Sequence, residues 1–316
     1  MIDYDVIVPT HNHAKFIEQS LTSIVNQTIQ PKTIIIVNDN STDHTETLIN
    51  KFISANKKIN IVLFNNKIQL GPGQSRNVGI SMSRSKYLSF LDSDDIWYAN
   101  KIEEQQKRFL DPNFNNLGIV YCSHVFINNN KKYFDLTTFQ KAQLRGYIFY
   151  NLFSGNKISG SCSSILCKRE IFNSCGVFNN DYYYVEDWEF FIRVAEKYNF
   201  DYVDKYLLEI RIHDTNRSKL LNEKISKQFK KKIDELYKDK NTPNEIKKIL
   251  TNELKISSFK KHYNRLRQYT LFRSIIKNSS ALILYIFGNK IHYKIKLLCR
   301  KILTIIITKK FEKEFH

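Results

Sequence analysis

Two hydrophobic patterns alternate along the first hundred residues. Short continuous apolar runs have the length of strands buried on both faces. Between them, apolar residues recur every three or four positions, as on one face of a helix. The apolar runs span 5–9, 33–38, 59–64 and 87–91, and the helix-like segments span 14–26, 43–55 and 73–83. This alternation predicts an α/β fold with a mostly parallel, Rossmann-like sheet flanked by helices.

The pattern changes twice further along the chain. After Trp97 we expect a helix at 98–109, a strand at 118–127, a helix at 188–198 and an extended segment at 202–212. From about residue 222 onward only helical patterns occur. We therefore predict a domain at 1–220 and an α-helical C-terminal region at 221–316.

Charge separates the same two parts. Residues 1–218 carry 24 basic and 23 acidic residues, whereas residues 219–316 carry 25 basic and 8 acidic residues. A basic, helical region with apolar stretches indicates an anionic partner, either a membrane surface or a nucleic acid. The alternative is a solvated helical face with no such partner.

Processing and cysteine signals favour a cytoplasmic protein. The N-terminus lacks the positive and apolar segments of a signal peptide. No stretch reaches the roughly 18 apolar residues of a spanning helix. The five cysteines are irregularly spaced without a CxxC pair, so reduced thiols are expected instead of disulfides or a zinc site.

Polar residues follow three of the predicted strands. Thr10 and Asn12 come after the first, Asp39 after the second, and Asp92 and Asp94 after the fourth. Carboxyl ends of parallel strands meet at one edge, where ligands bind. Helix capping would explain Asn12, but it does not explain three carboxylates at one edge.

The pair Asp92-x-Asp94 points to a cation. Neighbouring carboxylates repel each other unless a cation or a proton neutralises them. Mg²⁺ or Mn²⁺ bound by one or two carboxylates together with substrate phosphates is a common arrangement. The loop at 71–77 lacks both the dinucleotide and the P-loop fingerprints, and it places Arg76 near a helix start where it could meet a diphosphate. A plain turn with an exposed Arg76 is the alternative.

Four motifs together resemble family 2 glycosyltransferases with the GT-A fold. They are DVIVPTHN at 5–12, VNDNSTD at 37–43, SRNVG at 75–79 and FLDSDD at 90–95. Their order and spacing are similar to those of the family over about residues 3–215. One departure is Asn38, which stands where the family commonly has an aspartate.

The resemblance implies a nucleotide-sugar site. It assigns Pro9, Thr10, Asn12 and Asp39 to the base and ribose. Arg76 and Ser93 belong to the same expected site. It assigns Asp92 to the ribose and metal side and Asp94 to the metal.

Two later segments complete the implied site. Val185-Glu186-Asp187-Trp188 is similar to the ED motif of the family, which makes Asp187 the general base and Glu186 a supporting group. Without the resemblance, Asp187 as a helix cap would be the preferred interpretation. The segment 211–218 resembles the closing loop, which implies that His213 lies near the metal and that Arg217 neutralises the diphosphate.

The resemblance implies an inverting, metal-dependent enzyme that uses Mn²⁺ or Mg²⁺. It would transfer a hexosyl or N-acetylhexosaminyl group from a nucleotide sugar, with UDP favoured, to a glycan or lipid-linked acceptor. Bacterial surface polysaccharide synthesis (capsule, lipopolysaccharide or lipooligosaccharide) is the expected pathway. The aromatic and lysine-rich stretch 285–310 suits an interfacial helix, which predicts a peripheral position on the inner face of the cytoplasmic membrane.

Two other functions remain as alternatives. A sugar nucleotidyltransferase also binds a nucleotide and a metal on an α/β sheet, but a glycine-rich, lysine-containing signature is missing at the first strand. A nucleic-acid-binding protein could use the basic region. It would leave residues 1–218 without a role, so we expect no nucleic acid partner.

Overall fold

The computed structural model describes residues 2–128, 139–140, 144–213 and 231, which all belong to one unit spanning Met1–Leu250. The predicted helical region at 221–316 lies outside the described residues except for Lys231. The domain boundary at 220 and the interfacial helix at 285–310 therefore stay predictions.

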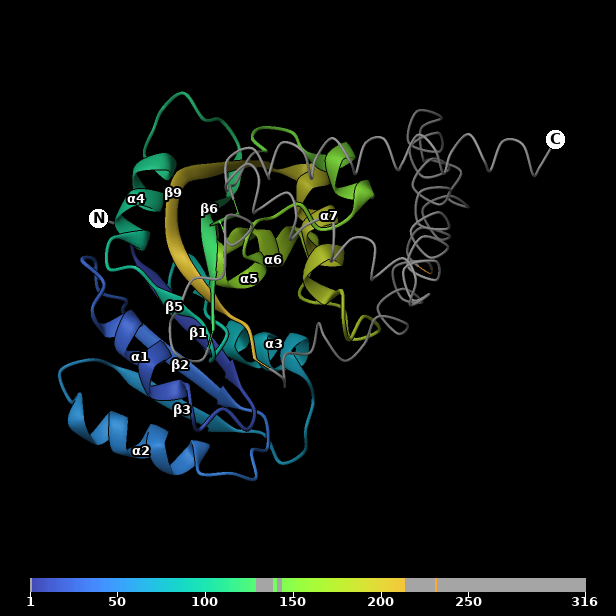
Figure 1. Ribbon diagram of the computed structural model, residues 1–316. Coiled ribbons are helices and arrows are strands. Elements are labelled where there is room, and N and C mark those ends of the chain that lie inside the picture. The colour runs from blue at the N-terminus through green and yellow to red at the C-terminus, as the bar shows by residue number, and fades with distance from the viewer. Residues whose placement is uncertain (1, 129–138, 141–143, 214–230, 232–316) are drawn as a thin grey trace, which may run out of the picture. The chain divides into compact units, whose positions relative to one another are not determined.

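A nine-stranded mixed sheet with helices around it forms the described domain (Figure 1). The strands are β1 (Tyr4–Thr10), β2 (Thr33–Asn38), β3 (Ile61–Asn65), β4 (Tyr87–Phe90), β5 (Ile96–Trp97), β6 (Leu117–Ile127), β7 (Phe139–Gln140), β8 (Leu166–Lys168) and β9 (Asn199–Arg211). The helices are α1 (Ile17–Val25), α2 (Thr45–Ala55), α3 (Pro72–Met82), α4 (Lys101–Phe109), the 3₁₀ helix η2 (Phe149–Ser154), α5 (Ser161–Ser164), α6 (Glu170–Cys175) and α7 (Glu186–Lys197). The strand order is β3-β2-β1-β4-β8-β6-β9-β5, and β7 pairs with β6.

The sheet is parallel in its first half and mixed in its second. β1 pairs in parallel with β2 and β4, and β2 pairs in parallel with β3. β8 runs antiparallel to both β4 and β6, whereas β9 is parallel to β6. The α/β class predicted from the sequence is confirmed, and the sheet becomes mixed where the strand–helix alternation ends.

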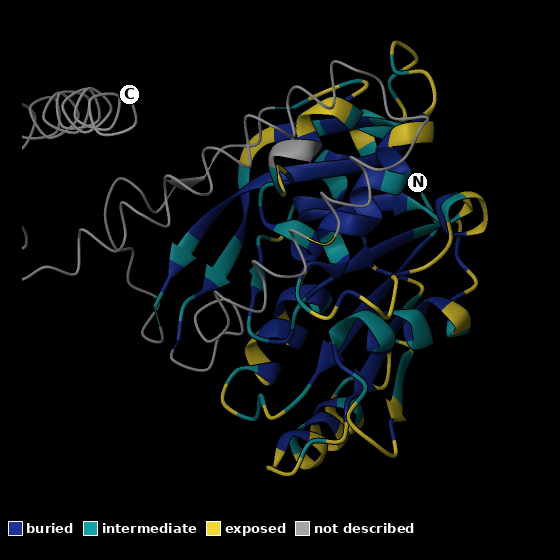
Figure 2. Ribbon diagram, turned by 90° about the vertical axis from the view of Figure 1, so that its right-hand side faces the viewer, coloured by how far each residue is buried: buried dark blue, intermediate teal, exposed yellow. Residues whose placement is uncertain are grey.

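Alternate residues of β1 serve opposite faces of the sheet. Val6 and Val8 belong to the core cluster that includes the apolar faces of α1 and α2. Ile7 faces α3 on the other side, so closely that a Cβ on Gly79 would lie 2.4 Å from Ile7 Cγ2. Glycine at position 79 therefore lets α3 approach the sheet. The central strands are buried on both faces, as Figure 2 shows.

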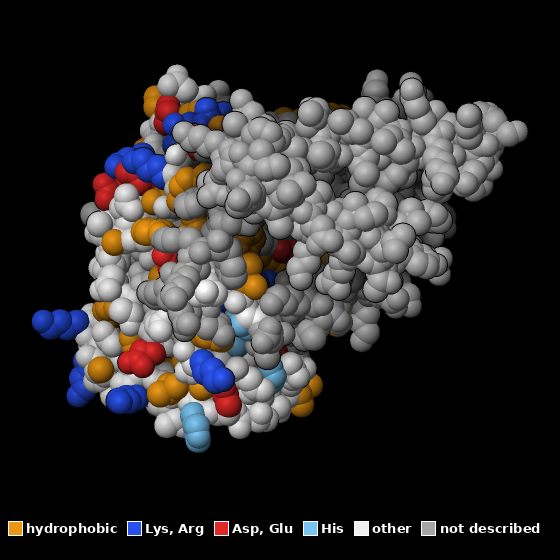
Figure 3. Space-filling model, viewed as in Figure 1, with side chains coloured by type: hydrophobic (Ala, Val, Ile, Leu, Met, Phe, Trp, Pro, Cys, Tyr) orange, Lys and Arg blue, Asp and Glu red, His pale blue; other side chains and the backbone are white. Residues whose placement is uncertain are grey.

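Two expectations about the surface and the thiols can be checked in the described residues. Basic and acidic side chains are interspersed on the face shown in Figure 3, in line with the balanced charge of residues 1–218. No helix in this part of the chain is long and apolar enough to cross a membrane. Cys122, Cys162, Cys167 and Cys175 are free thiols.

Candidate active site

A cleft of about 580 Å³ opens where β1, β2 and β4 end. Its size falls in the range typical of small-molecule sites. Every site residue predicted between positions 9 and 187 lines it: Pro9, Thr10, Asn12, Asp39, Arg76, Asp92, Ser93, Asp94, Glu186 and Asp187. His213 contacts the lining residue Asp94 through its Nε2. Arg217 lies outside the described residues. The structure thus brings the predicted groups together in one cleft.

The ends of β1 and β2 form one side of the cleft. Thr10 pairs with Asn38 in the parallel register, and the amide of Asp39 donates to the carbonyl of Thr10 at 2.8 Å. The Thr10 hydroxyl is buried and has no hydrogen-bond partner among the described residues. A buried hydroxyl without a partner is unfavourable, so a ligand group that bonds it would bind well here.

Asp39 holds the loop that precedes α3. Its carboxylate accepts hydrogen bonds from the amides of Leu70 and Gly71 at 2.8 and 2.7 Å, and from Asn66 Nδ2 at 2.7 Å. A carboxylate offers about four acceptor positions. One position therefore remains for an N–H group of a ligand in the cleft.

Asn12 joins the β1 end to the following loop. It has a left-handed backbone with φ of 53°, and its Oδ1 accepts the amide of Thr42 at 2.8 Å. The backbone amide of Asn12 donates to Ser41 Oγ at 2.9 Å. Asn12 thus shapes the wall of the cleft without capping a helix.

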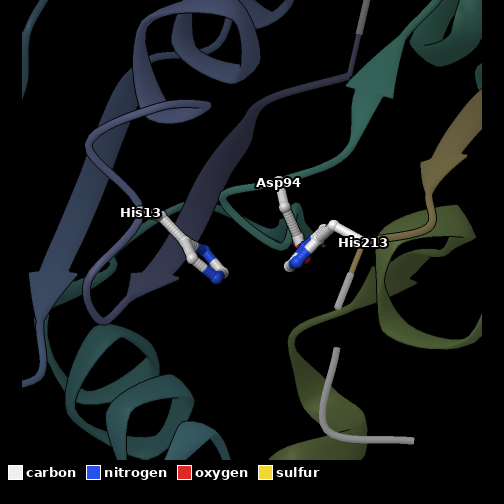
Figure 4. A group of neighbouring side chains, drawn as sticks. All are labelled: His13, Asp94 and His213. Atoms are coloured by element: carbon white, nitrogen blue, oxygen red, sulfur yellow. The ribbon is translucent and has the colours of Figure 1, made fainter. Parts of the chain in front are cut away.

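A cluster of two histidines and an aspartate lies beside this wall (Figure 4). His13, Asp94 and His213 each offer one ligand atom, and these atoms lie within 4.8 Å of one another. His13 Nδ1 lies 2.6 Å from Ser93 Oγ, a contact that orients the imidazole ring. A mixed set of imidazole nitrogens and a carboxylate oxygen fits a divalent transition metal. Of the predicted metal ligands, Asp94 and His213 belong to this cluster and Asp92 does not, while His13 is an additional candidate ligand. The set fits the divalent metal that the sequence predicts.

The two adjacent acids Asp94 and Asp95 have opposite electrostatic environments. Burial would raise the pKa of Asp94, but the hydrogen bond with His213 and the charges of His13 and His213 lower it overall. Burial, together with the charges of Asp94 and Asp92, raises the pKa of Asp95 well above its usual value. Asp95 is held by Ser163 Oγ at 2.7 Å and by the amide of Arg211 at 3.2 Å. It is a support for the acidic loop.

Arg76 connects the two acidic motifs. Its Nη2 lies 2.6 Å from Asp92 Oδ1 and its Nη1 lies 3.2 Å from Glu186 Oε1. Burial would lower the pKa of Arg76, but the charges of Asp92 and Glu186 keep it well above its ordinary value. The guanidinium lines the cleft as predicted, yet it is engaged by acids from positions 92 and 186.

Asp187 lies in the first turn of α7 and faces the cleft. Its Oδ1 accepts the amide of Trp188 at 2.6 Å. Its Oδ2 accepts the hydroxyl of Ser161 and Asn156 Nδ2, the latter at 3.2 Å. The first turn of a helix is a favourable place for a carboxylate, because the positive end of the helix dipole lies there.

Sequence reasoning missed several members of this site. His13, Ser161 and Asn156 were not predicted, because isolated polar residues carry no spacing signal. The only hint for His13 was its place two residues after His11 in the segment that follows β1.

Comparison with known proteins defines the class. Residues 5–176 match the family described as Glycosyl transferase family 2. The chain belongs to this family. The fold and the acidic loops described above agree with that membership, and the nucleotidyltransferase alternative is not supported.

Several curated relatives are glycosyltransferases. The chain is 36% identical over 144 residues to an uncharacterized glycosyltransferase of Rickettsia bellii, covering 46% of this chain and 20% of the relative. It is 29% identical over 229 residues to an uncharacterized glycosyltransferase of Methanocaldococcus jannaschii, covering 71% of this chain and 74% of that relative. It is also 30% identical over 188 residues to WfgD of Escherichia coli, a UDP-Glc:α-D-GlcNAc-diphosphoundecaprenol β-1,3-glucosyltransferase. This match covers 58% of this chain and 69% of WfgD.

Solved structures share the fold. S. aureus TarS in complex with UDP-GlcNAc matches with a TM-score of 0.59 at 19% identity, covering 80% of this chain and 72% of that one. The mannosyltransferase PcManGT from Pyrobaculum calidifontis, in complex with GDP-Man and Mn²⁺, matches with a TM-score of 0.58 at 16% identity, covering 99% and 90%. At these identities the likeness concerns the fold.

Proposed function

We propose that this glycosyltransferase moves a hexosyl or N-acetylhexosaminyl group from a nucleoside-diphosphate sugar to an acceptor hydroxyl, with inversion at the anomeric carbon. The observation that carries the proposal is the bridge made by Arg76. One buried guanidinium holds Asp92 of the acidic loop and Glu186 of the α7 start together. The candidate donor side and the candidate base therefore face one cleft.

The nucleotide belongs at the β1–β2 side in this proposal. The Thr10 hydroxyl can donate or accept a hydrogen bond, and the remaining position of the Asp39 carboxylate can accept one, so both can bind polar groups of a base and ribose. A divalent cation held by His13, Asp94 and His213 would neutralise the charge that develops on the leaving diphosphate. Mn²⁺ suits this set better than Mg²⁺, because Mg²⁺ prefers oxygen ligands.

Asp187 acts as the general base of the reaction. Acceptor hydroxyls ionise far above neutral pH, so attack requires a base within hydrogen-bond reach. The carboxylate accepts the proton as the acceptor oxygen bonds to the anomeric carbon and the bond to the diphosphate breaks. A single displacement of this kind inverts the configuration and forms no covalent sugar–enzyme intermediate.

Relatives support the substrate class. WfgD uses UDP-Glc and a diphosphoundecaprenol-linked acceptor, as its name states, and TarS and PcManGT have been solved with UDP-GlcNAc and with GDP-Man. We infer that a UDP-sugar is the donor and that a glycan or lipid-linked saccharide of a bacterial surface polysaccharide is the acceptor. Such an acceptor would place the enzyme peripherally at the inner face of the cytoplasmic membrane.

A nucleotide screen by thermal shift tests the proposal. Purified protein is heated with UDP, GDP, CMP or dTDP, each with and without Mn²⁺. We expect UDP to raise the midpoint only when Mn²⁺ is present, and Asp94→Ala to abolish this shift. The absence of a shift with every nucleotide, with and without metal, would contradict the proposed donor site.

A further inference from the structure

We propose that Ser161 and Asn156 are positioning residues that orient the Asp187 carboxylate and determine which of its oxygens takes the acceptor proton. The inference rests on the proposed function, in which Asp187 is the base. It is carried by hydrogen bonds from a segment that neither the sequence motifs nor the family relationship assigns to the reaction.

The hydrogen bonds to Asp187 are distributed unevenly. The Ser161 hydroxyl and Asn156 Nδ2 both donate to Oδ2. The amide of Trp188 donates to Oδ1. Each carboxylate oxygen has about two acceptor positions. Oδ2 is therefore saturated, and the free position that can receive a proton is on Oδ1.

The backbone around Ser161 is held in an uncommon conformation. Gly160 and Ser161 are successive left-handed residues, with φ of 72° and 49°. A Cβ at position 160 would lie 2.6 Å from Leu208 Cδ2 of β9, so the turn is packed against the sheet. A non-glycine residue with positive φ is uncommon and persists where surrounding contacts impose it. Here the conformation directs the Ser161 hydroxyl onto Asp187.

Neighbouring contacts fix both ends of this turn. Ser159 Oγ lies 2.7 Å from His124 Nδ1 on β6. Asn156 Oδ1 accepts the amide of Ile158 at 3.0 Å, which orients its Nδ2 toward Asp187. The segment that contacts Asp187 is thus tied to strand β6, and a support for a catalytic group is more precise when it rests on such an element.

The same segment also supports the acidic loop. Ser163 Oγ accepts the amide of Asp92 at 3.0 Å and donates to Asp95 at 2.7 Å. Residues 156–163 thus contact both the loop that carries the candidate metal ligand and the candidate base. One segment therefore supports both the acidic loop and the candidate base.

Ser161→Gly is the decisive variant. Glycine adopts positive φ without strain, so the fold is retained while the hydroxyl is lost. We expect kcat to fall about ten- to a hundredfold with the donor Kd unchanged within about twofold, because a misplaced base slows the chemical step alone. Hydrogen bonds to a carboxylate favour its charged form. Their loss therefore moves the acidic limb of the kcat–pH profile to higher pH.

Asn156→Ala and Asn179→Ala form a matched pair. Both asparagines accept an amide two residues further along, from Ile158 and Asp181 respectively, but only Asn156 contacts Asp187. We expect Asn156→Ala to lower kcat and shift the acidic limb, and Asn179→Ala to leave both unchanged.

The outcomes separate the inference from the proposed function. If Asp187→Asn is inactive while Ser161→Gly keeps kcat within about twofold and an unchanged pH profile, the positioning role is overturned and the base assignment stands. If Asp187→Asn retains full turnover, the base assignment fails and the inference fails with it.

Discussion

His213 Nε2 lies 2.9 Å from Asp94 Oδ2, and the two residues are 119 positions apart in the chain. Asp94 follows the last strand of the parallel half of the sheet, and His213 follows the long strand β9. Residues that follow strands in the two halves of the sheet are therefore in contact at the Asp94 carboxylate. Since His13 approaches from the β1 end, three separate segments contribute to the cluster.

Loss of an imidazole from this cluster should weaken metal binding. We expect His13→Ala to reduce Mn²⁺ affinity, measured by electron paramagnetic resonance in the presence of UDP, by at least about tenfold, because one of three protein ligands is removed. Affinity for Mg²⁺ should be lower than for Mn²⁺ in the parent protein. His44→Ala, at an exposed position on the surface, should change neither value. Equal Mn²⁺ affinity in His13→Ala and the parent would exclude His13 as a ligand.

Removal of Arg76 should destabilise the domain. Its buried guanidinium pairs with the carboxylates of both Asp92 and Glu186, so its replacement breaks both contacts. Breaking a buried ion pair from one side costs about 3–5 kcal/mol, so Arg76→Met should lower the free energy of unfolding in urea by that order. Arg84→Met, at an exposed site, is the control and should change it by less than about 0.5 kcal/mol. A similarly small effect of Arg76→Met would show that the bridge contributes little.

Asp187→Asn should separate chemistry from binding. Asparagine keeps the shape of the side chain but replaces one accepting oxygen with a donating NH2 group, and it cannot take a proton. We expect kcat to fall about 10²- to 10⁴-fold, with the affinity for UDP unchanged in a calorimetric titration. Parallel losses of UDP affinity and kcat would instead point to a structural role for Asp187 in the cleft.

The sequence predicted those parts of the molecule that repeat a pattern. Continuous aliphatic runs such as 33–38 predicted the parallel half of the sheet, and the polar residues after its strands converge as expected. Motif resemblance then brought Glu186 and Asp187 to the same cleft, a relationship that spacing alone does not contain.

The remaining features depend on tertiary contacts that no local pattern encodes. The short strand β5 is specified by its pairing with β9. Asp95 is buried beneath the acidic loop by Ser163 and Arg211 instead of capping a helix. Ser161 reaches Asp187 because two successive left-handed residues turn the chain, and a serine gives no sign of positive φ.

Lys101 should make stability depend on alkaline pH. Its ammonium is buried beside the Trp97 ring and donates to Gln105 Oε1 at 2.9 Å. Burial lowers the pKa of Lys101 from 10.5 to about 8. Between these values the unfolded chain binds more protons than the folded one, so this group makes the free energy of unfolding rise with pH. The full rise is about 3 kcal/mol, since one pKa unit corresponds to about 1.4 kcal/mol.

Lys101→Met removes this contribution and tests it directly. The difference in the free energy of unfolding between the variant and the parent should favour the variant most at about pH 7 and shrink by about 3 kcal/mol toward about pH 10.5. Urea denaturation at several pH values measures that difference, and other titrating groups cancel in it because both proteins share them. Lys67→Met, at an exposed position, should give a difference that stays constant with pH. A constant difference for Lys101→Met as well would contradict the lowered pKa of Lys101. The ammonium would then be stabilised by more than its contacts with Trp97 and Gln105.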